Sequence, residues 1–213
     1  MAGYRDLLRT PGVGRIIAAQ LVARFPAGMT SLAVLLHIEH VTGSYGAAGL
    51  VLAATSIGQA VAGPVTSRWM GVWGMRRVLT VTLLVCATSV AVLGLVEMPL
   101  PAYMALGLLA GLSSPPVQAA VRTIYPKMVN SRQLTPLFSL DASAQEIIWV
   151  IAPVVTTFVA TQVGTVEAMM LIVVIQLSGG AWFILSPEGG RVLIPRSRGS
   201  IGKVLAKPPV LLA

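Results

Sequence analysis

Six apolar blocks of about 20 residues each divide the chain, and their length is the feature that most limits how it folds. The hydrocarbon core of a bilayer is ~30 Å thick, so a helix needs about 20 mostly apolar residues to cross it. The blocks run approximately over residues 16–37, 46–67, 78–98, 102–121, 137–160 and 166–185. The chain is 55% hydrophobic and 10% charged, whereas soluble domains carry about 25% charged residues. We therefore predict an all-α, polytopic membrane protein with six transmembrane helices.

The basic residues lie between the blocks in an alternating pattern. Fourteen of the 15 Lys and Arg residues fall in the N-terminal segment, the 2–3 and 4–5 connections and the tail, and the other three connections contain none. By the positive-inside rule both termini are expected in the cytoplasm, with the protein in the plasma membrane. A nucleic-acid-binding protein would instead gather its basic residues on a solvated face, so nucleic acid is not an expected partner. The fifteenth basic residue, Arg24, lies inside the first block.

Four blocks carry polar or small residues at spacings of three and four, which share one helix face. These residues are Gln20, Arg24, Gly28 and Ser31 in block 1, Gly49, Ser56, Gln59 and Gly63 in block 2, Gly107, Gly111, Ser114 and Gln118 in block 4, and Ser139, Ser143, Glu146, Pro153 and Thr157 in block 5. Gly107 and Gly111 are interpreted as a packing face. Polar side chains in membrane helices face the bundle interior or a cavity, so blocks 1, 2, 4 and 5 are predicted to be interior and blocks 3 and 6 peripheral.

The predicted cavity suits a small organic molecule, because it offers adaptable hydrogen-bonding groups beside apolar surface. Its candidate substrate or coupling residues are Gln20, Arg24, Gln59, Gln118, Glu146 and Trp149.

Arg24 and Glu146 are the two charges expected near the membrane midplane. Arg24 lies nine residues beyond Arg15 and Glu146 nine beyond Leu137, roughly 13 Å in at 1.5 Å per residue. A charge at this depth costs about 2.5–3.5 kcal/mol on insertion scales, and pairing offsets part of that cost. We expect the two side chains to face each other. Glu146 then either braces the bundle as an ionised partner or carries a proton, and the sequence leaves both roles open.

Catalytic and metal chemistry find little support in the sequence. No group of His, Cys and carboxylates has metal-ligand spacing and no nucleophile lies beside a base, so neither enzyme activity nor a metal or cofactor is predicted. The lone Cys86 is expected to be a buried, inert side chain. His37 and His40 are expected at a membrane interface.

Prolines suggest two features of the helical plan. The segments AVAGPV (60–65) and VIAPVV (150–155) place Pro64 and Pro153 at related positions in helices of opposite direction. This suits two inverted three-helix repeats, a common plan in secondary transporters. Pro115 and Pro116 are predicted to kink the fourth transmembrane helix.

The segment GPVTSRWMGVWGMRRVL (63–79) resembles the signature cytoplasmic loop of the major facilitator superfamily. In that loop a Gly opens the segment and an Asp-Arg-x-Gly-Arg-Arg cluster closes it. The matching residues here are Gly63, Gly74, Arg76 and Arg77. Gly71 stands where the family has its Asp, and Val72 where it has its first Arg. The family's Asp helps to latch two halves together, which Gly71 cannot do.

Further segments carry the resemblance along essentially the whole chain. IAPVVTTF (151–158) looks like a degenerate Gly-Pro motif with Ala152 in place of Gly, and SSPPVQAAVRTIYPKMV with LFSLDASAQEIIWV resembles actinobacterial drug-efflux-like members. The resemblance implies the N-terminal six-helix half of a twelve-helix secondary transporter. Substrate would bind between the halves, helices 1, 2, 4 and 5 would line the cavity, and one half would rock against the other.

Residues 1–185 are therefore expected to form a six-helix half-bundle. Residues 186–213 resemble a basic cytoplasmic linker that leads into a seventh span, or form an amphipathic tail on the membrane. We expect a truncated half of a transporter that exports a small organic molecule, with protons as the candidate coupling ion. Two alternatives stay open, namely a half-size transporter that pairs with a second copy and a non-transporting scaffold or remnant.

Overall fold

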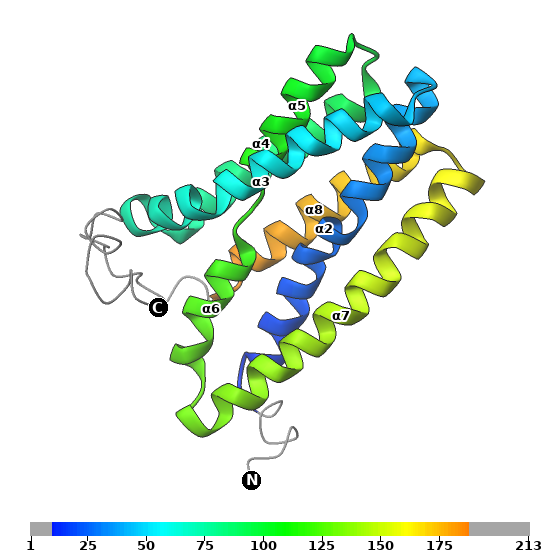
Figure 1. Cartoon of the computed structure of the whole chain (residues 1–213). Coiled ribbons are helices and arrows are strands. Elements are labelled where there is room, and N and C mark those ends of the chain that lie inside the picture. Colours follow the sequence, from blue (N-terminus) through cyan, green and yellow to red (C-terminus); the bar gives the residue numbers. More distant parts are fainter. Residues whose placement is uncertain (1–9, 188–213) are drawn as a thin grey trace, which may run out of the picture.

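The computed structural model describes residues 10–187, in which every regular element is a helix (Figure 1). The helices are α2 (Val13–Thr42), α3 (Tyr45–Trp73), α4 (Met75–Leu95), α5 (Leu100–Leu112), α6 (Val117–Met128), α7 (Ser131–Gln162) and α8 (Thr165–Leu185). Because α5 and α6 together form one interrupted span, 6 helical segments are long and apolar enough to cross a membrane. The prediction of an all-α protein with six spans is confirmed. The predicted linker, from residue 188 onward, lies outside the described residues.

Several helices are longer than the apolar blocks that predicted them. α3 continues to Trp73 and α7 begins at Ser131, so each extends six residues beyond its block. A hydropathy pattern marks only the part of a helix that lies in hydrocarbon, whereas capping groups set the actual ends. At the start of α7, the side chains of Asn130 and Gln133 form a capping box with each other's backbone.

Gly74 alone connects α3 to α4, so most of the predicted 2–3 loop is helical. Its backbone has φ 86° and ψ 148°, a conformation that is available almost only to glycine. The Gly74 N–H closes α3 by donating to the Met70 carbonyl oxygen at 3.2 Å. The reversal of chain direction at this end of the bundle therefore depends on one residue without a side chain.

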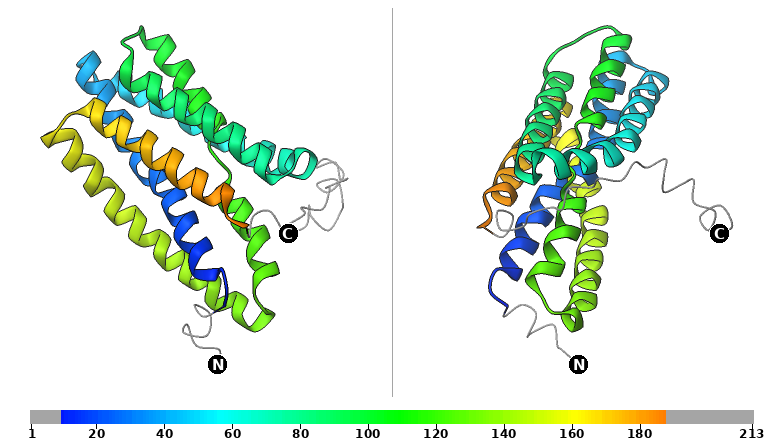
Figure 2. Two further views of the ribbon diagram at one scale, coloured as in Figure 1. Left: turned by 180° about the vertical axis from the view of Figure 1, so that it is seen from behind. Right: turned by 90° about the vertical axis from the view of Figure 1, so that its left-hand side faces the viewer.

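The bundle is held together mainly by contacts of α2 with α8 and α7, of α3 with α5, and of α4 with α8, and Figure 2 shows these helices from two further sides. Glycines allow some of the closest approaches. A Cβ on Gly111 would collide with the Thr55 carbonyl oxygen of α3, and one on Gly107 would lie 2.8 Å from Thr55 Oγ1. The interpretation of Gly107 and Gly111 as a packing face is confirmed. In the same way Gly28 of α2 faces Ala152 of α7.

The fourth span is broken in the middle, as Pro115 and Pro116 predicted. α5 ends at Leu112 and α6 begins at Val117, because two consecutive prolines supply no backbone N–H to continue the helix. The Leu109 carbonyl oxygen accepts hydrogen bonds from the Ser113 N–H at 2.9 Å and from the Ser113 hydroxyl at 2.6 Å, and these close the end of α5.

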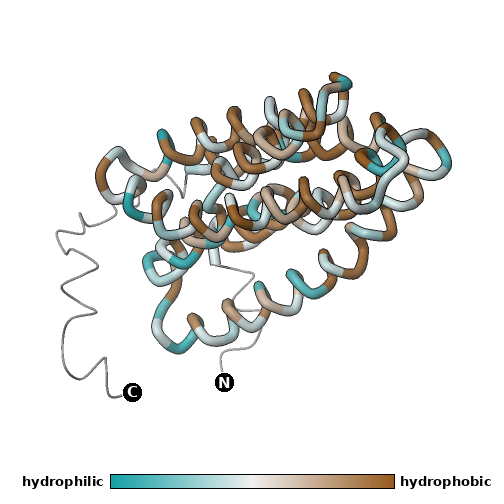
Figure 3. Tube along the Cα trace, turned by 45° about the horizontal axis from the view of Figure 1, so that its top comes forward, coloured by the Kyte–Doolittle hydropathy of each residue, from teal (hydrophilic) through white to brown (hydrophobic). Residues whose placement is uncertain are grey.

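Hydroxyl groups on the outer helix surfaces bond to their own helices. Thr88 Oγ1 donates to the Leu84 carbonyl oxygen at 2.8 Å, and Ser178 Oγ donates to the Val174 carbonyl oxygen at 2.7 Å. Such bonds hide the hydroxyl from hydrocarbon. Figure 3 shows hydrophobic residues along the length of the helices, with more hydrophilic residues interspersed among them.

Candidate functional site

A buried ion pair joins α2 to α7. Arg24 Nη1 lies 3.2 Å from Asp141 Oδ2 and 3.3 Å from Oδ1, and the side chains are only 10% and 13% exposed. Gln20 Oε1 accepts a 2.9 Å bond from Arg24 Nη1, and Gln20 Nε2 donates to Asp141 Oδ1 at 2.6 Å. The Tyr125 hydroxyl of α6 donates to the same oxygen at 3.3 Å. Asp141 therefore receives hydrogen bonds from three side chains on two other helices, which offsets the cost of burying its charge.

The expectation that Arg24 faces Glu146 is wrong, because Arg24 pairs with Asp141. Glu146 is exposed and forms no salt bridge within residues 10–187. The error came from the start of α7, which is Ser131 and not residue 137. Counted from their true helix starts, Arg24 lies 11 residues in, Asp141 10 and Glu146 15. These counts give depths of roughly 16, 15 and 22 Å, so Asp141 and not Glu146 is level with Arg24.

A cavity of about 320 Å³ lies beside this ion pair in the middle of the bundle. Of the candidate residues, Arg24, Gln59, Gln118 and Trp149 line it. Gln20 does not line it, since Gln20 is fully buried and holds Arg24 in place. The cavity thus brings together side chains from α2, α3, α6 and α7.

Blocks 3 and 6 also contribute to this cavity, contrary to the prediction that they are peripheral. Cys86 of α4 and Gln176 of α8 line its wall and are 8% and 5% exposed. The close approach of α8 to α2 explains the position of Gln176. A Cβ on Gly179 would lie 2.7 Å from the Val22 backbone, so one turn of α8 is drawn against α2.

Two further cavities continue the first one and make it a groove. A cavity of about 610 Å³ is lined by Arg24, Gln118 and Glu146 among others, and one of about 320 Å³ is lined by Gln59, Gln118 and Arg122 among others. Gln118 lines all three cavities, so we treat them as one polar groove. Its lining residues come in part from α3, α6 and α7, and Figure 1 shows α6 between α3 and α7.

The groove is open along one side of the bundle. Gln59, Gln118 and Glu146 are exposed, and Trp149 is 51% exposed. Only 17% of the most apolar window of α7 is buried, against 56% for α4. On the polar face of α7, Ser139, Ser143, Glu146 and Thr157 are exposed and Pro153 is half-buried, so most of this face lacks cover from the described part of the chain.

Three residues of the groove region were missed by sequence reasoning: Asp141, Tyr125 and Gln145. Asp141 would have been found by counting depth from the capping residue Asn130 and not from the first apolar residue. Gln145 lines two of the cavities, and its Oε1 atom is buried without a hydrogen-bond partner. No signal in the sequence distinguishes Tyr125 from other interfacial tyrosines.

Of the residues of the 2–3 motif, Gly63 lines the groove, in the cavity that Gln59, Gln118 and Arg122 also line, whereas Gly74, Arg76 and Arg77 do not. Gly63 lies inside α3, and Arg76 and Arg77 occupy the first turn of α4. Arg76 Nη2 donates to the Ser186 carbonyl oxygen at 3.3 Å, so it ties α4 to the end of α8.

Among residues 10–187 no three His, Cys, Asp or Glu side chains are close enough to hold a metal ion. The interfacial position expected for the two histidines stays a prediction. His37 is packed inside the protein and is 3% exposed. Its Nδ1 lies 3.1 Å from Thr165 Oγ1, between α2 and α8.

A six-span helical bundle with a polar groove at mid-depth is the architecture of a membrane transporter. The sequence matches the family described as Major Facilitator Superfamily over residues 16–213. The chain therefore belongs to the Major Facilitator Superfamily, as its 2–3 motif indicated. A comparison with curated proteins finds no match.

Proposed function

We propose that the protein is a secondary active transporter that exports a small organic molecule across the plasma membrane by alternating access. The polar groove is the observation that supports this function best. It lies at mid-depth, contains charged and amide side chains from five helices, and borders the broken helix α5–α6. Substrate sites of secondary transporters have this location and often use discontinuous helices.

The open side of the groove favours a second six-helix bundle as its other wall. Gln59, Gln118 and Glu146 would face hydrocarbon in an isolated bundle, at a cost of several kcal/mol for an unpaired charge alone. The second bundle is a C-terminal half of the same transporter, as the family resemblance implies, or a second copy of this chain. Both arrangements cover the same polar face.

The groove residues fall into two proposed roles. Arg24, held by Gln20 and Asp141, braces α2 against α7 at the level of the groove. Gln59, Gln118 and Trp149 supply hydrogen bonds and aromatic surface to the substrate. Glu146 is the proposed proton carrier, because it lines the groove and has no salt bridge among residues 10–187.

The helix contacts support the proposed inverted repeat. In an inverted repeat, α2 corresponds to the interrupted span α5–α6, α3 to α7, and α4 to α8. The α2–α8 contact then corresponds to a contact of α5 with α4. The α3–α5 contact corresponds to a contact of α7 with α2. Both corresponding contacts are observed. With the basic 2–3 and 4–5 connections in the cytoplasm, both termini are proposed to lie there too.

Transport measurements on proteoliposomes test the proposal. The purified protein is reconstituted, an inside-acidic pH gradient is imposed, and a panel of fluorescent organic cations and anions, including ethidium, is followed by fluorescence. We expect gradient-driven accumulation of at least one compound, and its loss in Glu146→Gln. Flux that is unchanged in Glu146→Gln would overturn the proton-carrier role.

The same purified protein tests whether a second six-helix bundle covers the groove. The mass of the protein in nanodiscs distinguishes a single bundle from a pair of bundles. A paired bundle that moves none of the compounds would contradict the transport function itself.

A further inference from the structure

A cleft outside the groove holds two stacked tryptophans and two arginines. Trp69 and Trp73 lie one turn apart at the end of α3, with ring centroids 5.3 Å apart and planes inclined by 21°. Arg76 and Arg77, in the first turn of α4, line the same cleft, which has a volume of about 600 Å³. It shares no lining residue with the cavities of the groove.

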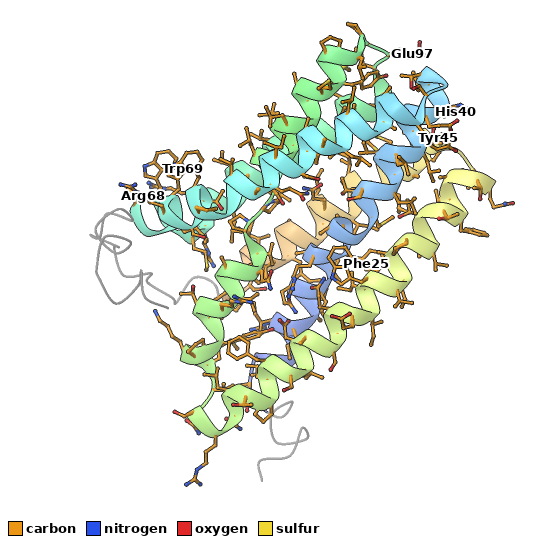
Figure 4. All side chains as sticks on the ribbon, viewed as in Figure 1. Phe25, His40, Tyr45, Arg68, Trp69 and Glu97 are labelled. Carbon is orange, nitrogen blue, oxygen red and sulfur yellow. The ribbon has the colours of Figure 1, made fainter. Side chains whose placement is uncertain are left out.

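The position of the tryptophans along α3 places this cleft at the membrane surface. Tyr45, at the opposite end of α3, is 65% exposed, and Trp69 and Trp73 are 41% and 56% exposed. Trp69 follows Tyr45 by 24 residues, or roughly 36 Å of helix, slightly more than the ~30 Å hydrocarbon core. Figure 4 shows Tyr45 and Trp69 at opposite ends of α3. Exposed Trp and Tyr at both boundaries are typical of side chains at lipid headgroup level.

The arginines of the cleft have no acidic partner in the part of the chain that the structure describes. Asp141 and Glu146 lie at the groove, and Glu97 is labelled at the other end of the bundle (Figure 4). Arg76 uses one N–H on Ser186. Within residues 10–187, Arg77 has neither an ion pair nor a side-chain hydrogen bond.

The surroundings of these arginines increase the positive potential. The first turn of α4 contains no acidic residue, and its N-cap, Gly74, has no side chain. The N-terminal end of a helix is itself partly positive and favours an anion. Gly71, where the family has an Asp, adds no negative charge.

We propose that this cleft binds the headgroup of an anionic phospholipid. The phosphodiester oxygens accept hydrogen bonds from the Arg77 guanidinium, whose planar fork matches a phosphate. The glycerol and upper acyl chain lie on the stacked indoles and on Val78 and Val81, which line the same cleft. A free phosphate would leave this apolar wall unused, whereas a lipid uses both parts of the cleft.

Quenching of tryptophan fluorescence by brominated lipids tests the site. A Trp149→Phe/Trp182→Phe background leaves Trp69 and Trp73 as the only tryptophans. It is placed in mixed nanodiscs with brominated phosphatidylglycerol or brominated phosphatidylcholine. A basic residue near an anionic surface contributes ~1 kcal/mol, so we expect phosphatidylglycerol to be preferred roughly fivefold. Arg77→Gln should reduce this preference to near onefold, whereas Arg77→Lys should retain part of it.

Arg132→Gln is the matched control, because it removes one charge at the start of α7 and outside the cleft. It should leave the preference unchanged. An equal loss in Arg132→Gln and Arg77→Gln would show a general surface charge effect and overturn the site.

Native mass spectrometry of the full chain gives a second reading that needs no tryptophan substitutions. We expect phosphatidylglycerol to be retained more than phosphatidylcholine, and excess inorganic phosphate not to displace it. Equal retention of the two lipids, or displacement by phosphate, would overturn the proposal.

Discussion

Arg24 and Asp141, which are 117 positions apart in the chain, form an ion pair of 3.2 Å between α2 and α7. α7 is the least buried span of the bundle. Its contact with α2 combines this ion pair with the close approach of Gly28 to Ala152. The position of α7 therefore depends strongly on a few side chains, which makes it a sensitive place to test the structure.

Asp141→Asn should destabilise the protein by about 3 kcal/mol, because it leaves the Arg24 charge buried without its counter-ion. SDS-titrated unfolding in mixed micelles measures the effect. Glu146→Gln is the control and should not destabilise the protein, since Glu146 forms no salt bridge among residues 10–187. In a double-mutant cycle, adding Arg24→Gln to Asp141→Asn should recover part of the loss. Strictly additive losses would show that the two residues are not coupled.

Gly111→Ala should destabilise the α3–α5 contact by about 1–3 kcal/mol, since the added methyl group meets the Thr55 backbone and the helices must separate. Gly49→Ala is the matched control in α3. A Cβ at Gly49 meets nothing within 4 Å, so the better helix propensity of Ala should stabilise the protein by about 0.5–1 kcal/mol. The same unfolding titration compares them, and equal effects of the two substitutions would contradict the packing described for α3 and α5.

Gly74→Ala should cost about 1–3 kcal/mol, because φ 86° with ψ 148° is strained for any residue with a side chain. Gly63→Ala provides the comparison within the same motif. Gly63 lies in the helical part of α3 with open space around it, so its replacement should be neutral or stabilising. If both variants unfold at the same SDS fraction as the wild type, the sharp reversal at Gly74 is wrong.

Thiol labelling in nanodiscs should separate the groove from the lipid-facing surface. On a Cys86→Ser background, Gln118→Cys should react rapidly with a membrane-impermeant maleimide, because Gln118 lines all three cavities of the groove. Ser178→Cys should react slowly, since Ser178 lies on the outer face of α8 and bonds only to its own helix. Rapid labelling of both cysteines would remove the distinction between the two surfaces.

The number of spans could be predicted from the sequence because it depends on the summed hydropathy of many residues in each block. Six blocks of about 20 apolar residues leave few alternatives in a bilayer. The break at Pro115 and Pro116 was equally predictable, since it follows from the missing N–H groups of proline. Helix ends were not, because Asn130 and Gly74 act through local backbone geometry that hydropathy does not record.

The partner of Arg24 depended on those same ends. A shift of six residues in the start of α7 corresponds to roughly 9 Å along the helix, which is enough to exchange Asp141 for Glu146 as the nearest carboxylate. The position of Gln176 in the cavity wall was not predicted for another reason, since its span was expected to be peripheral. It depends on the depth to which Gly179 and Gly180 let α8 approach its neighbours, and this is a property of three helices packed together.

The interruption of the fourth span divides it into two mechanically different pieces. The first piece, α5, is fixed on α3 by close contacts at Gly107 and Gly111. The second piece, α6, carries Gln118 and touches chiefly α2 and α7. Residues 113–116 can therefore act as a hinge. A tilt of α6 about this hinge would move Gln118 and widen or narrow the groove, while α3 and α5 keep their positions.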